Sequence, residues 1–243
     1  MNAHVHFFPV SEVQAEMSNF ERFLDTFFNA TVLAKYAPAI LSGVGVTITL
    51  SILIIVVGMV AGTLLACVRA YQIKPLSFLI VIYVDIFRAL PPLVLILLIF
   101  FGLPSVGILL SSFMVLFVVL ALILAAFAEE IIWAGITSID QGQWEAARST
   151  GLGFTKALIY VVMPQAIRLA IPPLTNRAIA ITKMTALGTV IGVPDILNQA
   201  STAQSFSGNA SPLMLAALAY VLLFLPFVVL SRLLESRYSW RKA

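Results

Sequence analysis

Long runs of apolar residues without a charged side chain make up most of the chain. No charge occurs between Lys35 and Arg69, nor between Arg88 and Glu129. A helix needs about 20 apolar residues to cross the hydrocarbon core of a bilayer, so the second run is too long for one helix. Glycine, proline and serine at 102–107 divide it, and Pro91 and Pro92 are expected to break or kink the helix before that point. The pattern predicts five membrane-spanning helices, at about 40–67, 76–101, 107–134, 168–191 and 212–232.

The composition supports this prediction. Hydrophobic residues make up 61% of the chain and charged residues 10%, whereas soluble proteins carry about 25% charged residues. The mean hydropathy is +1.05. We therefore expect an all-α integral membrane protein without a sizeable soluble domain. Cys67 is the only cysteine, which excludes a disulfide within the chain and a thiolate metal site.

The first 35 residues differ from the rest of the chain. They contain acidic residues and lack the basic start of a signal peptide, so we expect an extracytoplasmic segment at 1–35, before a transmembrane domain at 36–243. Residues 11–34 fit a helix on a membrane surface, with large apolar side chains on one side. These side chains are Phe20, Phe23, Leu24, Phe27 and Phe28. His4 and His6 are interpreted as part of an exposed tail rather than as a metal site.

The basic residues predict the orientation of the spans. Lysine and arginine occur between spans one and two, between spans three and four, and after span five. The loops at 102–106 and 192–211 contain none. Cytoplasmic loops carry the excess of basic residues. We therefore expect the N-terminus outside and the C-terminus in the cytoplasm, which agrees with an odd number of spans. The small net charge of +3 fits this topology better than nucleic-acid binding.

The longest cytoplasmic connection, at 137–167, contains a second type of element. Gln143–Ser149 consists of good helix formers, Gly151 is a natural stop, and Pro164 precedes the next span. We predict a short helix outside the membrane that meets another surface. Its small side chains allow close approach and its charged ones allow pairing across an interface: Ala146, Ala147, Glu145 and Arg148. The alternative is an ordinary amphipathic linker.

This segment resembles the EAA loop of ABC-importer permeases. The family pattern is Glu-Ala-Ala, three residues, glycine, nine residues, then Ile-x-Leu-Pro. The matching positions, with the spacing intact and two hydrophobic positions changed conservatively, are Glu145, Ala146, Ala147, Gly151, Val161, Met163 and Pro164. In that family the loop forms a coupling helix that seats in a groove of the ATPase subunit. The resemblance implies a type I ABC importer permease in the bacterial cytoplasmic membrane.

Other segments resemble the polar amino acid branch of that family, which includes histidine, glutamine and arginine permeases. They are Phe87–Pro91, Phe100–Pro104, Pro164–Ala166 and Ile191–Asp195. The resemblance implies import of an amino acid or a relative of one. The chain departs from the branch where Trp133 replaces a common basic residue and Leu95 replaces a common glutamine. These changes make the solute path less polar, so the branch does not specify the solute.

The resemblance also implies partners. No Gly-x-x-x-x-Gly-Lys-Ser/Thr phosphate loop occurs in this chain. We expect no cofactor here, with ATP and Mg bound by a dimer of separate ATP-binding subunits. A second permease chain, identical or related, would complete the pore, and membrane lipid would surround it. An extracytoplasmic solute-binding protein would deliver the solute to the loops at 102–107 and 192–211. The second loop is rich in serine, asparagine and glutamine, which suits a hydrated docking surface. No nucleic-acid partner is expected.

Several charged residues fall inside the predicted spans. A lone charge at the bilayer centre costs at least about 2.5 kcal/mol, so such residues face partners or water. The candidates for the solute path are Asp85, Arg88, Glu129, Glu130, Lys183 and Thr185. Glu130 and Lys183 match acidic and basic positions usual in the family, and together they are expected to form a polar patch suited to the ammonium and carboxylate groups of an amino acid. The alternative is a salt-bridge network that only holds spans together, and Arg177 fits such a helix contact.

Two other classes of function remain open. An intramembrane enzyme would use Glu129 and Glu130 as a carboxylate pair, but adjacent acids on one helix lie about 100° apart. A secondary transporter or channel acting alone fits poorly with five spans and no internal repeat. Neither explains the spacing from Glu145 to Pro164. We therefore expect no catalytic residue and no metal site in this chain.

Overall fold

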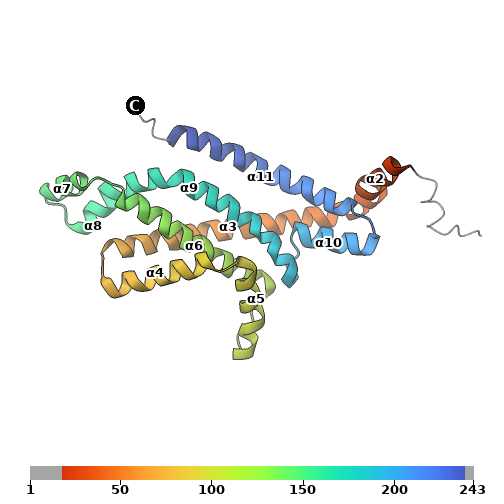
Figure 1. The fold of residues 1–243 in the computed structure, drawn as a ribbon, viewed down its shortest axis with the longest axis horizontal. Helices are drawn as coiled ribbons and strands as arrows, with labels where there is room; N and C mark the ends of the chain where they lie inside the picture. Colours follow the sequence, from red (N-terminus) through yellow and green to blue (C-terminus); the bar gives the residue numbers. More distant parts are fainter. Residues whose placement is uncertain (1–17, 239–243) are drawn as a thin grey trace, which may run out of the picture.

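The computed structural model describes residues 18–238, and this range is built from helices alone (Figure 1). His4, His6 and the start of the expected surface helix lie outside the described residues. The elements are α2 (Asn19–Phe28), α3 (Ala30–Ala70), α4 (Lys74–Ala89), α5 (Pro92–Gly102), η1 (Leu103–Val106), α6 (Ser112–Thr137), α7 (Gln141–Ser149), α8 (Phe154–Ala157), η2 (Leu158–Val162), α9 (Met163–Lys183), η3 (Met184–Ile191), α10 (Ile196–Ser207) and α11 (Ser211–Tyr238).

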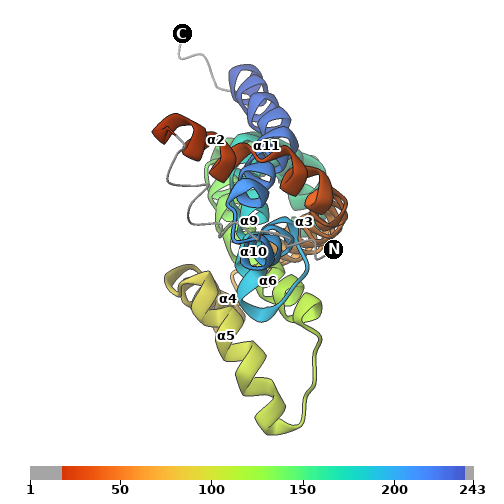
Figure 2. The same cartoon turned by 90° about the vertical axis from the view of Figure 1, so that its right-hand side faces the viewer.

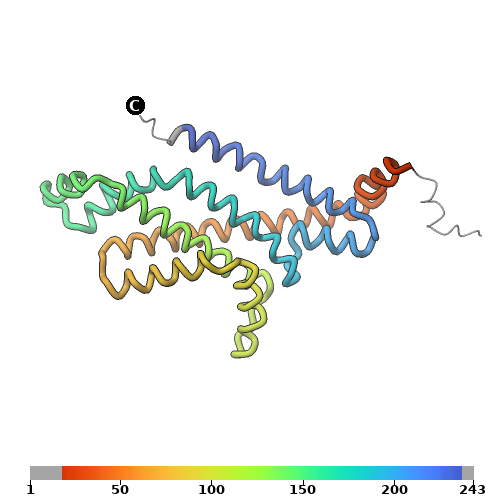
Figure 3. Tube along the Cα trace, in the orientation of Figure 1, coloured from red at the N-terminus to blue at the C-terminus, as the bar shows by residue number. Residues whose placement is uncertain are grey.

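The predicted all-α membrane fold is confirmed, with one span broken. Four stretches of the described chain are long and apolar enough to cross a membrane: Asn19–Ala70, Ser112–Thr137, Phe154–Ile191 and Ser211–Ser236. The fifth is a pair of helices, Lys74–Ala89 and Pro92–Val106, bent by 103°. The predicted span at 76–101 is therefore wrong as a single helix. Figure 3 shows α5 leaving the direction that the other long helices share.

Two prolines cause this bend. Leu90 precedes Pro91 and takes an extended conformation, with ψ of 136°, because the ring of a following proline disfavours helical backbone. Pro92 then begins α5, where its missing N–H leaves no helical hydrogen bond unmade. The break that the sequence predicts at Pro91 and Pro92 is confirmed, and the bend is larger than a simple kink.

The expected polar loop at 192–211 is also wrong. It contains α10, which begins after Asp195, whose side chain accepts a hydrogen bond from the Asn198 N–H. Ile196, Ala200 and Ala203 form the buried side of α10, which packs against α3 and α11. The serine, asparagine and glutamine residues of this segment obscure an apolar stripe at helical spacing.

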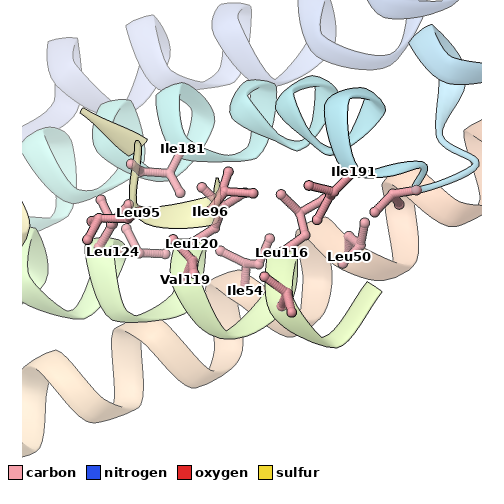
Figure 4. Packing of buried hydrophobic residues seen from close by; sticks show 13 residues of the cluster. Leu50, Ile54, Leu95, Ile96, Leu116, Val119, Leu120, Leu124, Ile181 and Ile191 are labelled. Atoms are coloured by element: carbon pink, nitrogen blue, oxygen red, sulfur yellow. The ribbon is translucent and has the colours of Figure 1, made fainter. Parts of the chain in front are cut away.

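The main core forms around α6, which packs here against α3, α5, the end of α9 and the following helix η3 (Figure 4). Large aliphatic side chains fill it; those labelled in Figure 4 are Leu50, Ile54, Leu95, Ile96, Leu116, Val119, Leu120, Leu124, Ile181 and Ile191. Helix α6 is buried on most of its surface, whereas α11 is mostly exposed. The fold therefore places the charges of α6 among its neighbours and not toward lipid.

Glycines hold α3 directly against α6. A Cβ on Gly58 would lie 2.8 Å from the Leu124 Cβ, and one on Gly62 would lie 2.6 Å from the Ala125 carbonyl oxygen. No larger residue fits at such distances. The Gly-x-x-x-Gly spacing thus marks a close contact between two helices.

The two ends of the molecule carry different elements. In Figure 1, α7 and α8 lie at one end of the long axis, and α2 and α10 lie at the other. Helix α2 runs across the direction of the long helices in the end-on view (Figure 2). The expected coupling helix α7 and the helix α2 are therefore at opposite ends of the spans.

Candidate functional site

Helix α7 is the predicted coupling helix, and its sequence gives it well-defined ends. Asp140 caps its start, because its carboxylate accepts a hydrogen bond from the Gly142 N–H at 2.7 Å. In its first turn, the Gln141 amide donates to the Glu145 carboxylate at 3.0 Å. The helix covers Gln141–Ser149, two residues earlier at its start than the prediction.

Gly151 ends α7 in a left-handed conformation, with φ of +87°. Its N–H donates to the Arg148 carbonyl at 3.0 Å, and the next N–H, of Leu152, donates to the Ala147 carbonyl at 3.4 Å. This pair of bonds is a Schellman motif, which satisfies the last carbonyls of a helix. A residue with a Cβ is strained at this φ, so the glycine of the loop has a physical function.

Aromatic side chains fasten α7 and α8 to the end of α3. Trp144 stacks on Phe154, with ring centroids 5.2 Å apart and planes at 20°. Phe154 also contacts Tyr71, at 5.1 Å between centroids, and the Tyr71 hydroxyl lies 3.0 Å from the Thr155 hydroxyl. A displacement of α7 is therefore passed directly to α3.

The remaining residues of the predicted surface divide into two groups. Ala147 is buried beneath the helix, whereas Glu145, Ala146 and Arg148 are exposed. Pro164 lies in the first turn of α9, after the π-helical turn η2. A proline has no N–H and its ring clashes with the carbonyl four residues earlier, which the wider π turn relieves. Three candidates thus point outward on one short helix.

A buried ion pair joins α3 to α6 within the membrane. The Arg69 guanidinium donates to both carboxylate oxygens of Glu129, at 3.1 and 3.2 Å. The Glu129 side chain is 0% exposed and that of Arg69 18%. Arg69 also lies over the Trp133 ring, 4.6 Å from its centroid. The sequence prediction missed Arg69, because it follows the apolar run and resembles a loop residue.

An open ion pair lies beside the buried one. Arg88 of α4 is 3.3 Å from Glu130, and these side chains are 36% and 42% exposed. Two guanidinium groups lie over the Phe127 ring, with Arg88 5.5 Å and Arg177 3.7 Å from its centroid. Four helices therefore bring charges together here, and the sequence offered no local signal for the contribution of Phe127.

The structure places the other candidates apart from this cluster. Asp85 is exposed, and the ion pairs of the described residues do not include it. The Lys183 ammonium lies 5.9 Å from the Phe224 ring centroid and forms no ion pair with Glu130 within the described range. Thr185 is buried, and its hydroxyl donates to the Thr182 carbonyl at 2.8 Å. The expected polar patch of Glu130 with Lys183 is thus not a direct contact.

Asp195 is a buried charged residue that the sequence prediction treated only as part of a loop. Its carboxylate accepts hydrogen bonds from the Thr189 hydroxyl at 3.1 Å, the Asn198 N–H at 2.9 Å and the Tyr220 hydroxyl at 3.3 Å. Burial raises the pKa of the Asp195 carboxyl above its ordinary value, while these donors act in the opposite direction. Asp195 therefore fastens η3, α10 and α11 together.

This geometry disfavours an intramembrane carboxylate-pair enzyme. Both Glu129 oxygens are occupied by Arg69, whereas Glu130 pairs with Arg88 at 3.3 Å and lies 4.0 Å from Arg69. Two acids that share a proton or a metal must converge on one point. Among the described residues, no group of three or more histidine, cysteine or acidic side chains lies close enough to hold a metal ion.

Comparisons with known proteins agree with the EAA-loop resemblance. Residues 54–240 match the family described as "Binding-protein-dependent transport system inner membrane component". The chain is 38% identical to the "Probable glutamine ABC transporter permease protein GlnP" of Bacillus subtilis (strain 168), over 75% of this chain and 84% of that one. It is 32% identical to the "Arginine transport system permease protein ArtQ" of the same organism, over 86% and 96%.

Solved structures extend this likeness to the fold. A chain from the crystal structure of an amino acid ABC transporter with histidines superposes with a TM-score of 0.77 at 36% identity, covering 84% of this chain and 96% of that one. A chain of the methionine transporter MetNI, in an inward-facing conformation, gives 0.62 at 20% identity and covers 90% and 99%; it shows the fold alone. The chain belongs to the family of inner membrane components of binding-protein-dependent transport systems.

Proposed function

We propose that this chain is the transmembrane subunit of a bacterial ABC importer and forms part of the path of an amino acid or an amino-acid-like solute. Family membership supports the importer. The relatives named for glutamine and arginine, and the amino acid transporter structure, support the class of solute. The observation that carries the proposal is α7, a short exposed helix ended by Gly151 in a left-handed conformation.

Helix α7 seats against a separate ATP-binding subunit, which binds ATP and Mg and hydrolyses the nucleotide. Glu145, Ala146 and Arg148 form its exposed face. Closure of two ATP-binding subunits moves α7, and the contacts of Trp144 and Tyr71 with Phe154 carry that motion to α3. A second permease chain completes the pore, and an external solute-binding protein delivers the solute at the opposite end.

The end that carries α7 faces the cytoplasm. Lys74, Arg148 and Lys156 belong to the connections at this end, and basic residues mark cytoplasmic loops. With five crossings, the N-terminus is outside and the C-terminus is inside the cell. The protein is accordingly a multi-pass component of the cytoplasmic membrane.

The open ion pair provides complementary charges for the solute. An amino acid carries an ammonium and a carboxylate group, which match the Glu130 carboxylate and the Arg88 guanidinium. Both side chains remain accessible in this chain. Asp85 and Lys183 are further charges that we place near the path. Thr185 contributes through helix geometry, because its hydroxyl is bonded within its own helical segment.

The test is ATPase activity in proteoliposomes that contain this chain, its ATP-binding subunit and its solute-binding protein. Loaded binding protein stimulates the native complex. Gly151→Asp abolishes the stimulation, because a side chain at this φ costs about 1–2 kcal/mol and distorts the end of α7. Failure of an ATPase subunit to co-purify, together with an unchanged Gly151→Asp complex, contradicts the proposal.

Gly153→Asp is the matched control. It makes the same chemical change two residues away, where φ is −65° and no atom lies within 4 Å of the added Cβ. Gly153 caps the start of α8, and aspartate is favourable at such a position. The control complex keeps its stimulation, which separates a fault in α7 from a general effect of added charge.

A further inference from the structure

Helix α2 carries a large apolar face that the described chain leaves uncovered. Four of its apolar side chains are between 40% and 68% exposed: Phe20, Phe23, Leu24 and Phe28. At 100° per residue, these positions share one side of the helix with Phe27. The polar residues Glu21, Arg22 and Asp25 occupy the other side. A contiguous apolar face of this kind is unfavourable in water and indicates a surface that contacts lipid or protein.

Hydrogen bonds fasten the end of α2 to the corner between α10 and α11. The Asn209 side chain donates to the Asp25 carbonyl at 2.7 Å, and the Ser211 hydroxyl donates to the Thr26 carbonyl at 3.4 Å. The Ser211 hydroxyl oxygen also accepts from the Asn29 N–H at 2.9 Å. These donors satisfy carbonyls at the end of the helix, which otherwise lack partners. The orientation of α2 is therefore fixed by the protein.

Two independent markers place this corner at the edge of the membrane. Ser211 is the first residue of the span α11. On α3, Lys35 lies over the Tyr36 ring, 5.1 Å from its centroid, and the charge-free run begins directly after it. Tyrosine and lysine are typical of the membrane–water interface. Asn29 precedes Lys35 by six residues, about 9 Å along a helix.

The direction of α2 agrees with this level. The spans run along the long axis of the molecule, and α2 crosses that direction at its end (Figure 2). A helix in this orientation lies parallel to the plane of the bilayer. The first turns of α11 also expose apolar side chains, those of Leu213 and Leu218.

We propose that α2 is an interfacial helix, whose phenylalanine face lies at the boundary between lipid headgroups and acyl chains on the side opposite α7. Such helices bind through buried apolar area, with or without attraction to anionic lipid. Glu21 and Asp25 outnumber Arg22, so Asn19–Phe28 has a net charge of −1. The binding is therefore apolar and needs no anionic lipid. This inference concerns the lipid contact of α2 and does not depend on which solute is carried.

The single native cysteine makes a direct test available. In a Cys67→Ala background, Phe23→Cys is labelled with an environment-sensitive fluorophore, and the assembled transporter is placed in phosphatidylcholine vesicles. Spin-labelled lipid with the nitroxide near the headgroup quenches this probe several-fold more than a probe at Arg22→Cys on the polar side of the helix. Leu24→Cys, on the same side as Phe23, behaves like Phe23→Cys. All three side chains are exposed, so none of the substitutions opens a cavity.

Three results distinguish the outcomes. Equal quenching at Phe23→Cys and Arg22→Cys, or quenching of both by aqueous iodide, overturns the proposal. A Phe23→Cys probe that is shielded only after the solute-binding protein is added also overturns it, because the face then binds protein. Adding phosphatidylglycerol leaves the quenching unchanged if the contact is apolar. The lipid readout requires no ATP hydrolysis, so its failure is distinct from failure of the importer assignment.

Discussion

Glu129 and Glu130 are neighbours in the sequence and differ in almost every physical respect. Glu129 is 0% exposed and has both oxygens bonded to Arg69. Glu130 is 42% exposed and pairs with Arg88 at 3.3 Å. One helical step of about 100° separates them. This step directs the Glu129 carboxylate into the contact between α6 and α3. It directs the Glu130 carboxylate toward the end of α4, just before the bend into α5.

The comparison shows that a charge inside a membrane can serve two purposes. The Arg69–Glu129 pair is closed, and a solute can reach neither oxygen without displacing the guanidinium. The Arg88–Glu130 pair keeps both partners accessible. We therefore expect Glu129 to act on the stability of the helix bundle and Glu130 to act on the solute. Three single substitutions and one double variant test this division, and the expected effects of the single substitutions decrease in the order given below.

Glu129→Ala has the largest expected effect. It leaves the Arg69 guanidinium in a mostly buried site with only the Glu130 carboxylate, 4.0 Å away, as a counter-charge. Breaking a buried pair costs about 3–5 kcal/mol. We expect a sharply lower yield of monodisperse complex and a large fall in its thermal unfolding temperature in detergent. An unfolding temperature equal to that of the native complex would show that Glu130 or water takes the place of Glu129 beside Arg69.

The double variant Arg69→Met with Glu129→Met sharpens this result. Replacing both partners of a buried pair by apolar residues is often neutral, because no charge is left behind. The double variant recovers most of the loss seen with Glu129→Ala. If it unfolds as early as Glu129→Ala, the defect arises from the packing of α6 and not from the lone charge.

Glu130→Gln has the next largest effect, and on a different quantity. The substitution keeps the shape of the side chain and removes its charge. A hydrogen bond to a charged group contributes about 1.5–3 kcal/mol, so we expect uptake of the solute into proteoliposomes to fall by about tenfold or more. The thermal unfolding temperature changes little, because an exposed ion pair contributes at most about 1 kcal/mol. Unchanged uptake would remove Glu130 from the path.

Trp133→Phe has the smallest effect. The Arg69 guanidinium lies 4.6 Å from the centroid of the Trp133 ring, and a smaller ring weakens this cation–π contact. The contact contributes about 0.5–1 kcal/mol at sites that are not fully desolvated. We expect a small decrease in unfolding temperature and native uptake. A decrease as large as that of Glu129→Ala would mean that Trp133, and not the ion pair, holds α3 to α6.

Local patterns in the sequence predicted the elements that local physics determines. Five apolar stretches, the break at Pro91–Pro92 and the helix stop at Gly151 follow from chain length, missing N–H groups and backbone conformation. The charged cluster does not follow from such patterns. Arg69 lies 60 residues from Glu129 and immediately after an apolar run, so nothing near it marks it as a buried residue.

Asp195, the N-cap residue of α10, is a second buried charged residue that its local sequence does not mark. The serine, asparagine and glutamine residues of its segment, 192–211, predict a hydrated loop. The structure buries Asp195 and folds the residues after it into α10. Its partners Thr189 and Tyr220 belong to two other elements. Packing between elements, which a single sequence does not display, decided both cases.

The glycine contact between α3 and α6 has a mechanical consequence. With the backbones of these helices separated only by Gly58 and Gly62, neither helix can slide or rotate against the other without collision. The two helices therefore move as one rigid unit, and the buried Arg69–Glu129 ion pair also holds them together. We therefore expect the opening and closing of the solute path to take place at the edges of the α3–α6 unit, where α4 and α5 diverge after Pro91. The fold thus combines a rigid pair of helices, α3 and α6, with a sharp bend between α4 and α5, and we expect a displacement of α7 to change the angle at that bend.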